Sequence, residues 1–270
     1  ALAVTSGTQT IETPGVSPDG RWLTFDSYRS GNFDIYRLEL PDGQPERLTE
    51  DPGDDFIPSW SPNGKEIAFH SFRYGTRDLF IMTADGGSEV RVTDDPGQER
   101  GPDWSPDGNS LVFAWDNTGN NELWVISRED SLSTWGEPQQ LTSDGGGAPR
   151  WSPDGEWIAY TAAATLRLVS PGGGPPRILV EGRTGNFDPA PVFADWSSDG
   201  RTVYFKARDS QGQASIWGMS LSGGAPHLLV RFDDPLRPSF RPEFATDGER
   251  FFFTVGTQES DIWVMELHPG

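Results

Sequence analysis

Short apolar segments alternate with turn residues along the whole chain. Residues 56–60, 66–70, 78–82 and 89–93 each carry β-branched or aromatic side chains with period-two character, which predicts half-buried strands. Ser61-Pro62-Asn63-Gly64, Gly75 and Asp85-Gly86-Gly87 separate them, and proline and glycine supply the backbone angles of tight turns. Four short strands joined in succession predict a four-stranded antiparallel sheet.

The same unit recurs through the sequence. Its marker is a turn motif, Trp-Ser-Pro-Asp-Gly at residues 151–155, with copies or near-copies at 16–20, 60–64, 104–108, 196–200 and 244–248. The final glycines, at positions 20, 64, 108, 155, 200 and 248, lie 44 to 48 residues apart. A period of this size is typical of propeller blades. We therefore predict an all-β, six-bladed β-propeller that forms one domain over residues 1–270.

The two ends of the sequence predict how the ring closes. Leu2-Ala3-Val4-Thr5 has the pattern of a fourth strand, although it precedes the first turn motif, and the last repeat stops after its third strand at 262–265. The N-terminal strand at about residues 2–5 is therefore expected to complete the last blade and remove open sheet edges. In blade 4, only residues 161–165 separate two strands, so its middle hairpin must be short.

The first strand of each blade should line a central channel. Trp60, Trp104, Trp151, Trp196 and Phe244 recur at one repeat position and are expected to pack between blades. Since side chains alternate along a strand, the preceding residue should face the channel. This inner ring is Gly15, Ser59, Asp103, Arg150, Asp195 and Glu243. A second ring two residues earlier is Thr13, Ile57, Gly101, Ala148, Phe193 and Arg241.

The predicted channel is polar and charged. Arg150 falls between Asp103 and Asp195, and Arg241 near Glu243, so these are candidate ion pairs. The mouth adds Asp55 and Glu99. The approach loops contribute Gln98, Arg100, Phe187, Phe232, Arg237 and Phe240. Two interpretations stay open: the charges neutralise one another and fill the pore, or they hold a small polar or cationic ligand, a peptide or a protein segment.

Composition narrows the choice of partner. The chain has 21 basic and 41 acidic residues and a net charge of −20, which disfavours nucleic acid and anionic lipid and favours cations and basic peptides; alternatively, the acidity serves solubility alone. No run of 18 apolar residues and no signal-peptide pattern occurs, so membrane insertion is not expected. Cysteine is absent, which excludes disulfides and zinc–thiolate sites.

Catalytic motifs are missing from the sequence. There is no Gly-x-Ser-x-Gly elbow, phosphate loop or His-Glu-x-x-His helix, and the three histidines, 70, 227 and 268, occupy different blade positions. We predict no enzymatic activity and no cofactor. One cation site is possible, where Asp54 and Asp55 on the loop 51–55 offer adjacent carboxylates to Ca²⁺, although solvated loop acids explain them as well. Residues 116–120 match an ordinary hairpin.

The repeats carry a family resemblance. Pro102-Asp103-Trp104-Ser105-Pro106-Asp107-Gly108, Asp34-Ile35-Tyr36, Asp85-Gly86-Gly87 and Arg47-Leu48-Thr49 resemble the WD40-like repeats of TolB-type six-bladed β-propellers. The resemblance spans the chain. It implies a monomeric, extracytoplasmic or periplasmic bacterial binding or sensing module, closest to the C-terminal sensor-like propellers of bacterial serine/threonine kinases. Alternatives from the same resemblance are a peptidase gating domain, a metal-dependent carbohydrate lyase and a TolB-like docking scaffold.

Overall fold

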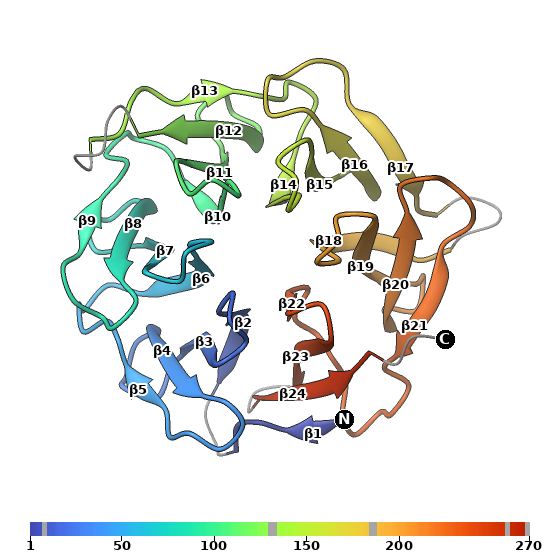
Figure 1. Cartoon of the computed structure of the whole chain (residues 1–270), viewed down its shortest axis with the longest axis horizontal. Coiled ribbons are helices and arrows are strands. Elements are labelled where there is room, and N and C mark those ends of the chain that lie inside the picture. The colour runs from blue at the N-terminus through green and yellow to red at the C-terminus, as the bar shows by residue number, and fades with distance from the viewer. Residues whose placement is uncertain (7–9, 129–133, 184–187, 257–259, 268–270) are drawn as a thin grey trace.

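The fold is a ring of six four-stranded antiparallel sheets, as predicted (Figure 1). The computed structural model describes residues 1–6, 10–128, 134–183, 188–256 and 260–267. Blades 1 to 3 comprise β2 (Ile11–Val16), β3 (Trp22–Ser27), β4 (Asp34–Glu39), β5 (Glu46–Arg47), β6 (Asp55–Trp60), β7 (Glu66–Ser71), β8 (Asp78–Thr83), β9 (Val90–Arg91), β10 (Arg100–Trp104), β11 (Ser110–Trp115), β12 (Glu122–Ser127) and β13 (Gln139–Gln140). Blades 4 to 6 comprise β14 (Gly147–Trp151), β15 (Ile158–Ala162), β16 (Thr165–Val169), β17 (Arg177–Glu181), β18 (Ala190–Trp196), β19 (Thr202–Arg208), β20 (Ala214–Ser220), β21 (His227–Arg231), β22 (Phe244–Thr246), β23 (Arg250–Gly256), β24 (Ser260–Glu266) and β1 (Leu2–Ala3).

The N-terminal strand completes blade 6, as the sequence predicts. Strand β1 pairs with β24, with Leu2 opposite Val264 and Ala3 opposite Trp263. Backbone bonding continues beyond the strand, because the Val4 N–H donates to the Ile262 carbonyl at 2.8 Å. Strands β1 and β24, which come from opposite ends of the described chain, therefore lie side by side in blade 6 (Figure 1).

The turn motif is fixed by its own hydrogen bonds. In the copy at 104–108, Ser105 Oγ donates to Asp107 Oδ1 at 2.5 Å and accepts the Ser110 N–H at 2.9 Å. Gly108 adopts a φ of 73°, a conformation that strains other residues. Since strands alternate in direction, all six turns lie on one side of the ring, called here the turn face. The connections between fourth and first strands, and the middle hairpins, lie on the opposite loop face.

The repeated aromatics pack between blades, as predicted. Trp104 is 5% exposed, and its indole Nε1 donates to the Ser59 carbonyl of the preceding blade at 3.2 Å. Trp196 Nε1 donates to the Arg150 carbonyl at 3.0 Å. Apolar burial and a specific hydrogen bond thus set the spacing of adjacent blades.

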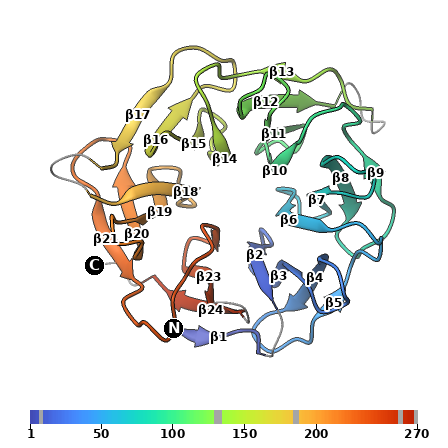
Figure 2. The same ribbon diagram turned by 180° about the vertical axis from the view of Figure 1, so that it is seen from behind.

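A β-bulge interrupts the innermost strands. The pairing register shifts between Phe56 and Ser59 in blade 2, and at corresponding places in blades 1, 3, 4 and 5. Ile57, Gly101 and Ala148 take positive φ values of 54°, 60° and 50° at the bulge. The bulge ends the simple alternation of side chains two residues before the inner ring. The innermost strands still surround the centre from either view (Figures 1 and 2).

Blade 4 has the short middle hairpin that the sequence predicts. Ala162 pairs with Thr165, which leaves a two-residue turn of Ala163 and Ala164 with φ values of 48° and 63°. Two consecutive positive φ values are typical of a type I′ turn. The described residues contain no helix long and apolar enough to cross a bilayer.

Candidate functional site

A cavity of about 530 Å³ occupies the turn-face end of the central channel. Its charged lining comes from the inner ring, with Asp103 on β10, Arg150 on β14 and Asp195 on β18. Gly15 and Ser59 also line it, together with the proline-containing turns around it. Five of the six predicted inner-ring positions therefore line this cavity, whereas Glu243 is not among its lining residues.

Asp103 and Asp195 face this cavity in different hydrogen-bonding surroundings. Asp103 accepts from Ser59 Oγ at 3.1 Å and from the Trp151 N–H at 2.7 Å. Asp195 Oδ1 accepts its neighbour's N–H, from Trp196, at 2.8 Å. Burial raises the pKa of both carboxyls, to about 7 for Asp195, while the nearby Arg150 cation lowers each. Asp195 is thus poised to change charge near neutral pH.

Arg150 does not form the predicted ion pairs. Its guanidinium donates to the Pro149 carbonyl at 2.8 Å and stacks over the Phe193 ring, with its central carbon 4.6 Å from the ring centroid. In the part of the chain that the structure describes, no direct ion pair joins Arg150 to Asp103 or Asp195. Stacking on Phe193 holds the cation at the wall. The Arg150 charge therefore lowers the pKa of both carboxyls through space without forming an ion pair with either.

Phe193 itself is a correction. The sequence placed it in the second channel ring, yet it is 2% exposed and packs edge-to-face on Phe244, with ring centroids 5.5 Å apart. The β18 register shifts between Pro191 and Phe193, so strict alternation fails at this point. Phe193 therefore belongs to the core and supports Arg150 from beneath.

The pairing of Arg241 is a second correction. Its guanidinium pairs with Glu12 on β2 and not with Glu243, since ring closure brings blade 1 against blade 6. Burial raises the pKa of Glu243, and the nearby Lys206 and Arg241 cations lower it in part. Glu243 therefore acts on its neighbours through space.

Sequence analysis missed two buried charged residues behind the channel wall. Lys206 is fully buried, and its Nζ donates to Ser239 Oγ and to the Arg241 carbonyl, both at 2.6 Å. Burial lowers the pKa of Lys206 to about 7. Asp26 is also fully buried, and burial raises its pKa to about 8. Each is a charged residue in the otherwise largely apolar second strand of its blade. A comparison of the repeats could have identified both.

The mouth residues Asp55 and Glu99 are both fully buried, but only Asp55 is paired. Both Asp55 oxygens accept from Arg73 at 3.2 Å. Among the described residues, neither Glu99 carboxylate oxygen has a hydrogen-bond partner, and burial raises the Glu99 pKa to about 8. Arg100 lies 3.9 Å from Asp116. The sequence placed Asp55 and Glu99 at the channel mouth, but both are buried and neither lines the cavity, so that placement is corrected.

The geometry does not support a metal at Asp54 and Asp55. Asp54 Oδ1 accepts the Phe33 N–H at 2.9 Å, and Asp55 is engaged by Arg73. Among the described residues, no three His, Asp or Glu side chains are grouped so that they could hold a metal ion. His70 and His227 belong to β7 and β21 in different blades, and His268 lies outside the described residues.

The predicted approach-loop residues lie on different connections of the ring. Phe232, Arg237 and Phe240 lie on the connection between β21 and β22, where Phe240 is 54% exposed. Gln98 lies before β10, and its backbone N–H donates to Asp116 Oδ1 at 2.9 Å. Phe187 falls outside the described residues.

Fold and channel together define a six-bladed propeller with a charged central cavity. Residues 1–194 match the family described as the TolB beta propeller domain, and this match covers more than half of the chain. The protein therefore belongs to the TolB beta propeller domain family.

Solved structures share the architecture. TolB from Acinetobacter baumannii is 22% identical, with a TM-score of 0.70, over 89% of this chain and 57% of that one. A putative TolB from Agrobacterium tumefaciens is 20% identical, with a TM-score of 0.72, over 98% and 93%. An oligogalacturonate lyase from Vibrio parahaemolyticus is 16% identical, with a TM-score of 0.63, over 98% and 78%. At these identities the likeness is one of fold.

The match to a curated relative is more local. An uncharacterized protein of Agrobacterium fabrum is 36% identical over 55 residues, which are 20% of this chain and 19% of that protein. The comparisons thus span about a fifth of this relative and just over half of the Acinetobacter TolB.

Proposed function

We propose that this propeller is a non-enzymatic binding or sensing module whose central channel holds a cationic group. That group belongs either to a small polar ligand or to the amino end of a peptide or protein. The observation that carries the proposal is the cavity of about 530 Å³ with Asp103 and Asp195 on its wall. Convergent polar groups in a concave site are the usual mark of a ligand pocket.

The balance of charge in the cavity favours a cation. Two carboxyl groups face one guanidinium, which is held over Phe193 instead of pairing with either acid. The net charge of −20 adds a long-range field that concentrates cations near the protein surface. An ammonium group between Asp103 and Asp195 would lower the pKa of both and replace water as their partner.

Calorimetric titration of triglycine amide, which carries a free ammonium group, tests the proposal. We expect saturable binding that is lost when the amino group is acetylated and weakened by Asp195→Asn. Glu156→Gln, an equal charge change at an exposed turn-face position, serves as the control and should leave binding unchanged. Equal binding of the free and acetylated peptides would overturn the proposal.

Binding should also depend on pH with a defined sign. The Asp195 pKa is about 7, so its ionised fraction rises between pH 6 and pH 8. A cation binds the ionised form, so the affinity, once corrected for the fraction of the peptide whose own α-amino group is protonated, should increase by roughly tenfold over that interval. Asp195→Asn should flatten this dependence, while a slope that survives the substitution would assign the titration to another group.

The family resemblance supports two further parts of the proposal. We infer that the module works outside the cytoplasm of a bacterium, because TolB-type propellers serve in the cell envelope. We also infer that it acts by binding without chemistry, since His70 and His227 lie in separate blades and offer no shared catalytic set within the described chain. Fractionation of the producing cell, with immunodetection, tests the location.

A further inference from the structure

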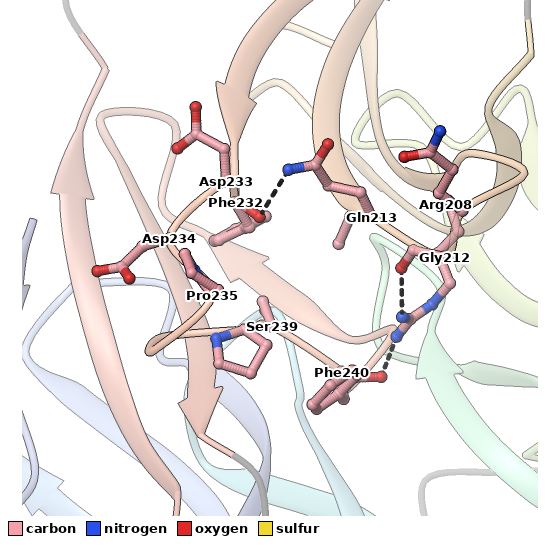
Figure 3. Close-up of a pocket in the computed structure, with 12 residues that line it drawn as sticks. Arg208, Gly212, Gln213, Phe232, Asp233, Asp234, Pro235, Ser239 and Phe240 are labelled. Atoms are coloured by element: carbon pink, nitrogen blue, oxygen red, sulfur yellow. Dashed lines mark hydrogen bonds between the residues drawn. The ribbon is translucent and has the colours of Figure 1, made fainter.

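A second cleft lies on the loop face, away from the central channel. It has a volume of about 280 Å³ and runs between residues 208–214 of blade 5 and residues 232–240 of the connection to blade 6 (Figure 3). We call it the blade 5–6 cleft. Its walls include Ala214, Phe232, Pro235 and Phe240. None of the inner-ring residues belongs to its lining.

Internal hydrogen bonds hold the two walls together. Arg208 donates to the Gly212 carbonyl at 3.4 Å and to the Phe240 carbonyl (Figure 3). Gln213 Nε2 donates to the Phe232 carbonyl at 3.4 Å. Beneath them, the Lys206 ammonium is engaged by Ser239, a residue of the lining. Arg208 and Lys206 are therefore committed to the fold.

The connection that forms one wall exposes unusual apolar surface. Leu236 is 89% exposed and Phe240 is 54% exposed, while Phe232 packs edge-to-face on Phe253 behind the cleft. Among the described residues, Leu236 is the most exposed large hydrophobic side chain. Exposed apolar groups beside a concave surface are typical of interaction sites.

The rim of the cleft is acidic. Asp233 and Asp234 are exposed and extend from the same wall (Figure 3). Asp234 Oδ1 accepts the Leu236 N–H at 2.9 Å, and its other oxygen lies 4.0 Å from Arg237 Nε. With the excess of carboxylates over the whole surface, the rim is complementary to a basic partner.

We propose that the blade 5–6 cleft docks a short segment of a partner protein that combines leucine-like side chains with neighbouring lysine or arginine. The apolar side chains cover Leu236 and enter the cleft between Phe232 and Phe240. The basic side chains reach Asp233 and Asp234, and a guanidinium or ammonium can also rest on the exposed Phe240 ring. Apolar anchors with a charged rim match the usual anatomy of a protein interface.

The probe is the peptide acetyl-Gly-Leu-Lys-Leu-Lys-Gly-amide, labelled for fluorescence polarisation. Its blocked amino end separates this site from the one proposed in the channel. We expect saturable binding that is retained in Asp195→Asn. The matched peptide with glutamate in place of lysine should bind at least about tenfold more weakly, with a smaller difference at high salt.

Exposed positions allow the cleft to be altered without disturbing the core. Leu236→Ser and the pair Asp233→Asn/Asp234→Asn should each weaken the lysine peptide about tenfold. Leu228→Ser on β21, also an exposed leucine, is the control and should change nothing. Absence of saturable binding, equal binding of the acidic peptide, or an equal effect of Leu228→Ser would overturn the proposal. Loss of binding in Asp195→Asn would instead assign the peptide to the channel.

Discussion

Asp55 and Glu99 occupy the same repeat position in neighbouring blades, each four residues before the channel-facing residue of its strand. In blade 2, Arg73 follows the second strand and places its guanidinium against Asp55 and over Phe80. In blade 3 the residue equivalent to Arg73 is Asn117, and within the described part of the chain the buried Glu99 carboxylate forms no ion pair. The same repeat position can thus bury an acid with or without a paired base.

Trp115 explains how blade 3 stays packed without a residue equivalent to Arg73. It replaces Ser71 of blade 2, and its ring packs near Trp124, with centroids 4.8 Å apart, as Arg73 packs over Phe80. The surface that a cation covers in blade 2 is covered by an indole in blade 3. Packing is conserved between the blades while electrostatic compensation is not.

Removal of Arg73 should make blade 2 resemble blade 3. Arg73→Met leaves Asp55 buried without its cation and should reduce the free energy of unfolding by about 3–4 kcal/mol at pH 8. Without Arg73, the folded-state Asp55 pKa rises further above about 6, so the loss should be smaller at pH 5, where the carboxyl is largely protonated. Urea unfolding at both pH values measures this. Arg21→Met, which breaks an exposed pair, is the control; a similar loss there would contradict the argument.

Neutralisation of Glu99 should increase the free energy of unfolding, whereas removal of Arg73 decreases it. Its folded-state pKa of about 8 exceeds the unfolded value, so ionisation destabilises the fold as pH rises from about 4.5 to 8. Glu99→Gln should therefore increase the free energy of unfolding by about 2–3 kcal/mol at pH 8.5 and by little at pH 5. Denaturant titrations at the two pH values check this. Glu50→Gln, an exposed acid, should show no such pH-dependent gain.

A substitution at Gly97 tests whether the Trp115 indole is tightly packed in blade 3. A Cβ added at Gly97 would lie 1.5 Å from Trp115 Nε1. Gly97→Ala should therefore displace the indole and destabilise the protein by about 2 kcal/mol, as overpacking does in other cores. Thermal unfolding followed by tryptophan fluorescence measures both effects. Gly147→Ala, where the added carbon meets nothing within 4 Å, should have no comparable effect.

The smallest expected effect concerns the bulge in the two blades. Ile57 and Gly101 are equivalent and share positive φ values of 54° and 60°. An added Cβ at Gly101 meets nothing within 4 Å, so Gly101→Ala isolates backbone strain and should cost about 1 kcal/mol. Ala148→Gly, at the same position in blade 4, should change stability in the opposite direction. Equal signs in urea unfolding would refute this interpretation.

The fold could be predicted from the sequence because its determinants repeat. The Ser-Pro-Asp-Gly turns, the wedge at Trp104 and the N-terminal strand at Leu2 are each specified by local residue types and confirmed. Five of the six inner-ring positions followed from simple alternation. Two residues before the inner ring, alternation failed at the β-bulge, and Phe193 was wrongly placed in the channel for that reason.

Charge partners were harder to predict than positions. Arg150 and Arg241 were assigned by proximity along the ring, but stacking on Phe193 and ring closure against Glu12 determine where these guanidinium groups lie. For Lys206 the position could be read from the sequence, because it is a single lysine within an apolar strand. Its partner could not, because Ser239 lies 33 residues away in the chain. Such partners depend on the packing of different blades, which the repeat pattern does not encode.

The closure of blade 6 gives the ring a mechanical latch. Strand β1 is held by two residue pairs on β24, followed by bonds from Val4 and Thr5 to Ile262. A force that lifts Leu2 sideways would break these bonds one after another, as in a zipper. A force directed along the strand would load them together. The force needed to detach β1 from β24 and open the ring therefore depends on the direction in which the strand is pulled.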